Sequence, residues 1–136
     1  MEIEKAQDYL REHHRAVLAT CRSGGTLQMS PVMVALDDEG RVMISSREHA
    51  FKVRNLRRSP HATLCVINDD FYSDWIQVEG PATIISLPDA MELLVEHYRS
   101  VSGEHLDWNE YREAMQTQER LIIRIDIESA GPDRQA

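Results

Sequence analysis

The 136-residue sequence has only two cysteines, few aromatic residues and no long hydrophobic run. Its longest unbroken apolar stretch, residues 32–36, is far shorter than the roughly 20 residues that span a bilayer. The first fifteen residues contain four acids and no apolar core, unlike a signal peptide. We therefore expect a cytoplasmic protein that contacts no membrane, in which Cys21 and Cys65 are small buried thiols without a disulfide.

Several short motifs of common enzyme classes are also absent. The sequence has no G-x-G-x-x-G, no P-loop, no C-x-x-C and no H-E-x-x-H, which argues against dinucleotide, P-loop nucleotide and zinc sites. His13 and His14 lie at a polar helix end, where a solvated surface is a better interpretation than a metal site. We predict no metal site, and no side chain is assigned as a catalytic acid or base.

Positive charge is scarce overall but concentrated in one segment. The chain carries 15 basic and 23 acidic residues, a net charge of -8, which disfavours nucleic acid and anionic membranes as partners. Residues 41–60, called the basic segment here, hold six basic residues and one acid, a net charge of +5. Such a segment in an acidic protein indicates a binding site for an anion.

The apolar periodicity predicts a mainly β fold with peripheral helices. Strands are expected over 16–22, 27–36, 41–46, 61–68, 75–85 and 121–128. Helices are expected over 2–13 and 48–58, after Pro88, and after Asp107, which with Glu110 forms a capping box. Since strands and helices do not alternate regularly, we expect residues 1–136 to form one domain built on a small closed antiparallel barrel.

Pro31 is unusual because it lies inside the expected strand 27–36. Proline has no N–H to donate to a neighbouring strand. Its presence indicates a strand edge, a bulge, or a place where something other than a strand meets the backbone.

The segment 45–58, SSREHAFKVRNLRR, carries the chemistry of an anion site. A strand delivers the hydroxyls of Ser45 and Ser46, a helix then begins, and Lys52 follows. Hydroxyls, free helical N–H groups and a lysine together suit a phosphate. The alternative is a solvated helix face bearing Arg54, Arg57 and Arg58.

The order and spacing of three segments resemble a known family. AVLATCRSGGTLQMSPV, VMISSREHAFKVRNLRRSPHATLCV and WIQVEGPATI are similar to the pyridoxamine-phosphate-oxidase-like split barrels, which bind a flavin or a deazaflavin. GEHLDWNEYREAM together with KVRNLRR resembles the actinobacterial-type subgroup that binds coenzyme F420, an 8-hydroxy-5-deazaflavin. The likeness covers residues 10–128.

This resemblance implies a six-stranded antiparallel split β-barrel that forms a homodimer, with two cofactor sites at the interface. The residues that match the family's cofactor-binding positions fall into three groups. Lys52 and Asn55 hold the phosphate, with Ser45 and Ser46 beside them. The strand along the cofactor ring contains Gln28, Met29, Ser30, Pro31 and Val32. The partner subunit contributes Ser73, Asp74 and Trp75, with Trp75 covering the ring.

The sequence departs from the subgroup at one position. The subgroup has an arginine two residues before the lysine, where this chain has Ala50. The nearest upstream arginine is Arg47, which we expect to reach the phosphate from the preceding turn.

The implied activity is a coenzyme F420-dependent hydride transfer from the reduced cofactor to an unsaturated or conjugated small molecule. The basic segment favours the deazaflavin, because coenzyme F420 carries a carboxylate-rich glutamyl tail. The alternatives are an FMN-dependent oxidoreductase of the same fold and a non-catalytic F420-binding carrier.

Overall fold

The computed structural model describes residues 1–132. The helices are α1 (Ile3–Glu12), α2 (Phe51–Arg58), α3 (Met91–Ser102) and α4 (Trp108–Thr117). The strands are β1 (Arg15–Cys21), β2 (Leu27–Leu36), β3 (Val42–Arg47), β4 (His61–Ile67), β5 (Trp75–Ile85), β6 (Arg120–Ile125) and β7 (Ser129–Gly131). None of the helices within 1–132 is long and apolar enough to cross a bilayer.

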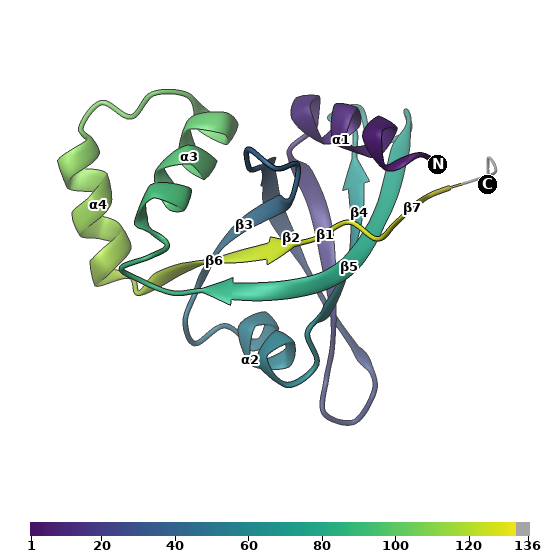
Figure 1. Cartoon of the computed structure of the whole chain (residues 1–136), viewed down its shortest axis with the longest axis horizontal. Helices are drawn as coiled ribbons and strands as arrows, with labels where there is room; N and C mark the ends of the chain where they lie inside the picture. Colours follow the sequence, from purple (N-terminus) through teal and green to yellow (C-terminus); the bar gives the residue numbers. More distant parts are fainter. Residues whose placement is uncertain (133–136) are drawn as a thin grey trace.

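Six of the strands form a closed antiparallel barrel. They follow the order β4-β1-β2-β3-β6-β5, and pairing of β5 with β4 closes the circle, while β7 adds to the far side of β5. In Figure 1, α1 and α2 lie at opposite ends of this barrel, and the α3–α4 hairpin lies to one side. The mainly β, six-stranded antiparallel split barrel with peripheral helices is therefore confirmed.

The barrel interior is filled by side chains that alternate along the strands. In β1, Ala16 and Leu18 are buried, whereas Val17 between them is only half-buried and faces outward. Helix α1 adds Leu10 and helix α2 adds Leu56 to the same core, so each helix seals one end of the barrel. A second, smaller core lies outside the barrel, where α3 and α4 cover Ile122 and its neighbours.

The last strand is shorter than the sequence predicts. The expected strand 121–128 ends at Ile125, and the chain resumes as β7 only at Ser129. Between them the backbone of Asp126 crosses so close to Gly80 that a β-carbon there would collide with the Asp126 carbonyl. Glycine is therefore required at this crossing.

Two further expectations are corrected. The helix expected from residue 48 begins at Phe51, because β3 continues to Arg47 and the chain then turns, with Ala50 N–H donating to the Arg47 carbonyl. Both cysteines are free, as expected, but half-buried rather than buried. The alternation of β1 and β4 puts Cys21 and Cys65 on the outer face of the sheet.

Candidate cofactor-binding site

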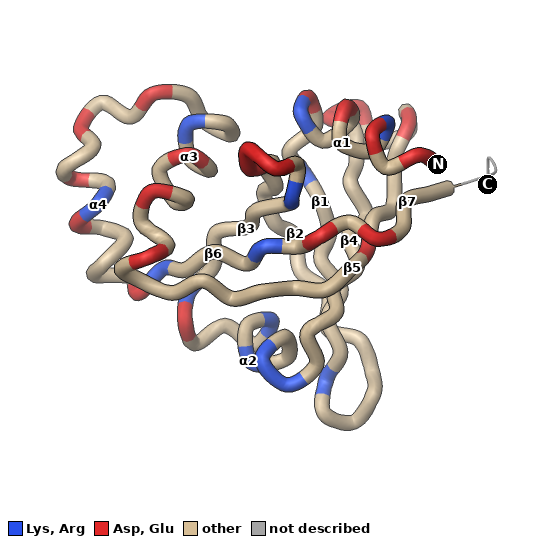
Figure 2. Tube along the Cα trace, in the orientation of Figure 1, with Lys and Arg blue, Asp and Glu red and all other residues tan. Residues whose placement is uncertain are grey.

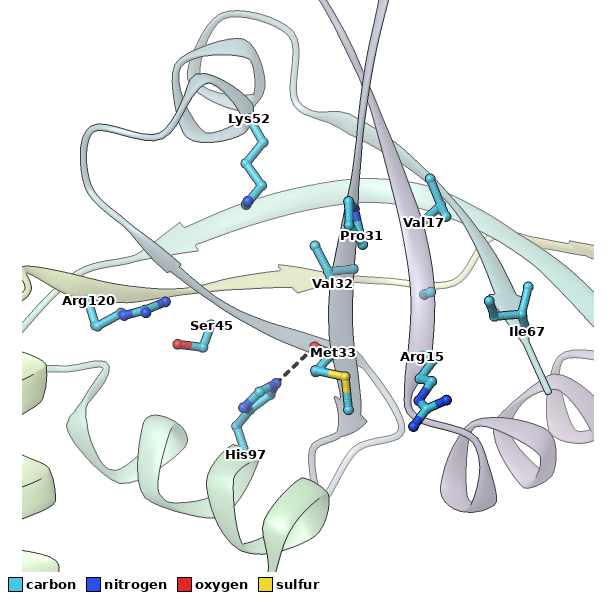
Figure 3. Close-up of a pocket in the computed structure, with 11 residues that line it drawn as sticks. Arg15, Val17, Pro31, Val32, Met33, Ser45, Lys52, Ile67, His97 and Arg120 are labelled. Atoms are coloured by element: carbon cyan, nitrogen blue, oxygen red, sulfur yellow. Dashed lines mark hydrogen bonds between the residues drawn. The ribbon is translucent and has the colours of Figure 1, made fainter. Parts of the chain in front are cut away.

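A cavity of about 580 Å³ lies beside β2, bounded by α2, α3 and the edges of β1, β3, β4 and β6. Figure 3 shows its walls. The lining residues are Arg15, Ala16, Val17, Pro31, Val32, Met33, Ser45, Lys52, Ile67, His97 and Arg120. The walls are mostly apolar, and the polar groups are predominantly cationic, a pattern suited to an anionic ligand with an apolar body.

Four residues predicted from the sequence meet in this cavity: Pro31, Val32, Ser45 and Lys52. Helix α2 places Lys52 so that its side chain extends down into the space above Ser45. Burial, with a further contribution from the positive charge of Arg120, lowers the pKa of Lys52 below its ordinary value. The surroundings of Lys52 therefore disfavour its positive charge.

The edge of β2 along the cavity has no partner strand within residues 1–132. β2 pairs with β1 over 27–33 but with β3 only over 34–36. Val34 N–H donates to the His14 carbonyl on the β1 side. Because backbone groups alternate along an antiparallel strand, those of Met29, Pro31 and Met33 face the open side. Pro31 thus lies at a strand edge, which is one of the three interpretations that the sequence allowed. Because its backbone faces away from β1, the missing N–H removes no hydrogen bond to that strand.

His97 closes the far end of this edge from α3. Its Nε2–H donates to the Met33 carbonyl at 3.0 Å (Figure 3). Burial lowers the pKa of His97, the hydrogen bond to the Met33 carbonyl raises it, and the neighbouring His14 and Arg120 lower it further. The imidazole is therefore held neutral as a donor. The next free carbonyl along the open edge is that of Pro31.

Other predicted residues lie outside the cavity. Asn55 and Gln28 line a separate hollow of about 410 Å³ on the other side of α2, together with Arg22, Arg54 and Arg58. The side chain of Asn55 is already engaged, donating to Thr20 Oγ1 and accepting from Arg58.

The two serines of β3 have opposite orientations. Ser45 faces the cavity, whereas Ser46 is 2% exposed and points into the barrel, where its hydroxyl has no hydrogen-bond partner among residues 1–132. Ser30 likewise has a buried hydroxyl without a partner in that range. Arg47 is exposed at the end of β3 and does not line the cavity.

Ser73, Asp74 and Trp75 lie at the loop between β4 and β5. Tyr9 and Asn68 both donate to Asp74 Oδ1, at 3.1 and 2.9 Å, and the Asn68 hydrogen bond chiefly lowers the pKa of Asp74. These contacts attach the loop to α1. None of the three residues lines the cavity of its own chain.

Arg120, His97, Met33 and Arg15 are cavity residues that the sequence did not reveal. Arg120 is the most consequential of them, since it brings a second cation beside Lys52. Figure 2 shows Lys and Arg gathered on α2, while acids concentrate around α1, α3 and the β2–β3 turn. Within 1–132, no group of three or more His, Cys, Asp or Glu residues is arranged to hold a metal ion.

Comparison with known proteins identifies the family. The family model for pyridoxamine 5'-phosphate oxidase matches residues 3–131, and the chain belongs to this family. Conserved hypothetical protein Rv2991 from Mycobacterium tuberculosis has a similar structure, with a TM-score of 0.78 and 21% identity, over 100% of this chain and 92% of that one.

Two further structures share the fold. A protein named F420 reductase has a TM-score of 0.72 and 21% identity, over 92% of this chain and 94% of that one. HutZ, the heme storage protein from Vibrio cholerae, has a TM-score of 0.71 and 17% identity, over 96% of this chain and 95% of that one. At these identities the likeness establishes the fold and not a shared ligand.

Proposed function

We propose that this chain is a coenzyme F420-dependent oxidoreductase that reduces an unsaturated or conjugated small molecule. The observation that carries the proposal is the combination, in one cavity, of a half-buried lysine with an unpaired strand edge. The first feature suits the phosphate of the cofactor, and the second suits the polar edge of its ring.

The residues present fit such a cofactor. Lys52 would hold the phosphate, with the Ser45 hydroxyl beside it. The Met29 N–H and the Pro31 carbonyl face the open side of β2, where a ring with both donor and acceptor atoms can take the place of a strand. A reduced deazaflavin bound there supplies a hydride to the substrate.

The remaining residues of the cavity orient and shield the ligand. Val17, Val32 and Ile67 provide apolar walls that exclude water from one side of a bound ring. Among residues 1–132 no carboxylate lines the cavity, and the Nε2–H of His97 donates to the Met33 carbonyl. The chain thus offers binding and orientation, and no side chain is assigned as the proton donor of the reduction.

We also propose that the working unit is a homodimer. The outer face of the β2-β1-β4-β5 sheet is largely apolar along β1 and β2, where Leu27 and Met29 are each 60% exposed, and polar along β4 and β5, where His61 pairs with Glu79. Val17, Met33 and Ile67 belong to both this face and the cavity wall. A second copy packed on this face would cover the open side of the cavity and bring its own residues 73–75 toward the ring.

The cofactor assignment is tested by titrating the purified protein with coenzyme F420 and with FMN and following fluorescence. Tighter binding of coenzyme F420 is expected, because the three arginines of the second hollow offer partners for a carboxylate-rich tail. Tighter binding of FMN would replace the proposal with an FMN-dependent enzyme. Binding of the deazaflavin without oxidation of its reduced form by any member of a substrate panel would indicate a carrier.

The dimer is tested with Met29→Glu, which places a charge on the exposed apolar face. Light scattering should show a dimer for the wild-type protein and a monomer for the variant, because a buried unpaired carboxylate is strongly unfavourable. Lys5→Glu, on the exposed surface of α1, is the matched control and should remain dimeric. A wild-type monomer that binds the cofactor tightly would refute the interface site.

A further inference from the structure

Two cations extend into the same end of the cavity from distant parts of the chain. Lys52 comes from α2 and Arg120 from the first position of β6, with Ser45 on the same wall as Arg120 (Figure 3). The barrel brings them together because β6 pairs with β3, so that Arg120 lies directly opposite Arg47 in the register.

Neither cation is paired with an acid in the part of the chain that the structure describes. The two nearest acids in the sequence are engaged elsewhere, Glu48 with Arg57 and Glu119 with His49. Across residues 1–132, no carboxylate forms an ion pair with Lys52 or with Arg120. An anionic ligand is the counter-charge that this end of the cavity lacks.

The Arg120 side chain is oriented by its own turn. Its Nε–H donates to Gln118 Oε1 at 3.0 Å, which leaves the terminal guanidinium nitrogens available for the planar, two-point contact that arginine makes with phosphate. Burial, followed by repulsion from Arg47, lowers the pKa of Arg120. A bound anion would offset both effects, and would do the same for Lys52.

We infer that Arg120 is a second phosphate-binding residue of this cavity, acting with Lys52, and that it substitutes for the arginine missing at Ala50. The inference rests on the proposed function, since the phosphate is that of the cofactor. Arg47, the candidate from the sequence, lies one strand away and does not line the cavity. Arg120 reaches the same phosphate from β6 instead of from the turn before α2.

The first test compares each cofactor with its phosphate-free counterpart: FMN with riboflavin, and coenzyme F420 with the deazariboflavin that lacks phosphate and tail. In Arg120→Gln, the preference for the phosphorylated form should fall by about tenfold or more, while affinity for riboflavin and the deazariboflavin stays the same. Arg120→Lys should restore part of the preference. Arg112→Gln removes an arginine paired with Glu92 on the α3–α4 hairpin and should leave the preference for the phosphorylated form unchanged.

The result for Arg47→Gln decides between the two arginines. A loss of phosphate preference in Arg47→Gln, with none in Arg120→Gln, would overturn the inference. A phosphate preference retained in both variants would overturn it as well. Thermal unfolding of each variant shows whether a change in affinity merely follows loss of the fold.

The second test needs no cofactor. Lys52 is one of only two lysines, the other being Lys5, so its side-chain NMR signals are readily assigned. The pKa of Lys52 should rise in Arg120→Gln, because a neighbouring positive charge is removed, and should stay the same in Arg112→Gln. An unchanged Lys52 pKa in Arg120→Gln would refute the shared site. If the wild-type protein binds neither cofactor, the proposed function fails, and this titration still decides whether the two cations share one site.

Discussion

Replacement of Lys52 by methionine separates the charge of this residue from its packing. Methionine keeps an unbranched stem of similar length and removes the ammonium group. A hydrogen bond to a charged group contributes about 1.5–3 kcal/mol, and each 1.4 kcal/mol is about tenfold in affinity. Lys52 is half-buried and has no carboxylate partner within residues 1–132. The free energy of its contact with a phosphate should therefore fall within that range. We expect cofactor affinity to fall by about tenfold to a hundredfold.

The assay is a fluorescence titration of wild-type protein, Lys52→Met and Lys5→Met with coenzyme F420 and with FMN. Lys5 lies on the exposed face of α1 and controls for the loss of one lysine charge. An affinity unchanged in Lys52→Met would refute the phosphate site. So would an equal loss in Lys5→Met, since the effect would then reflect net charge alone.

The same substitution should make the ligand-free protein more stable. The pKa of Lys52 is lowered from its ordinary 10.5 by burial and by Arg120, so the unfolded chain binds this proton more tightly than the native protein does. The charged lysine therefore costs stability at neutral pH, and that cost disappears only as the pH rises through the native pKa towards 10.5. Lys52→Met should raise the melting temperature of the ligand-free protein while weakening binding. A lower melting temperature would mean that the binding loss follows from a damaged fold.

Two further substitutions test the surroundings of the cavity. The pKa of His97 is lowered from 6.5 by burial, so its contribution to stability is fully present above that value and declines as the pH falls towards the native pKa. In urea unfolding from about pH 7.5 to about pH 5, the wild-type protein should lose more stability than His97→Gln, and parallel curves would contradict this. Tyr9→Phe removes the hydroxyl that donates to Asp74, so amide hydrogen exchange should speed up in residues 68–75 but not in β1 or β6. Unaltered exchange in that loop would show that Tyr9 does not anchor it.

The sequence was sufficient for most of the barrel because strand alternation is a local signal. Apolar residues at every second position marked β1 and most of β6, and Asp107 was recognised as a helix cap, which accepts from the N–H groups of Asn109 and Glu110. The break at Asp126 was missed because it depends on a crossing over Gly80, on another strand. A close approach between distant segments leaves no periodic pattern in either.

The candidate site likewise contains residues that a local sequence pattern indicates and residues that only the tertiary structure brings to it. Lys52 was found because its helix follows a strand with hydroxyls, all within one short segment. Strand alternation could also have indicated that only one of Ser45 and Ser46 faces the cavity, since neighbouring side chains on a strand point to opposite faces. Arg120 could not be found, because only the pairing of β6 with β3 brings it to Lys52. His97 was hidden for a comparable reason, since its partner is a backbone carbonyl of β2.

The charge distribution explains how an acidic chain can hold an anion. With a net charge of -8, the chain as a whole does not attract anions over long distances, and attraction of that kind is screened within about 8–10 Å at physiological salt. Affinity must instead come from contacts in the cavity, where burial reduces screening and no protein carboxylate competes within residues 1–132. Repulsion between Lys52 and Arg120 disfavours both charges, and a phosphate bound between them would offset that repulsion. On the proposed function, selectivity for anions would therefore arise from a local deficit of negative charge in an otherwise acidic chain.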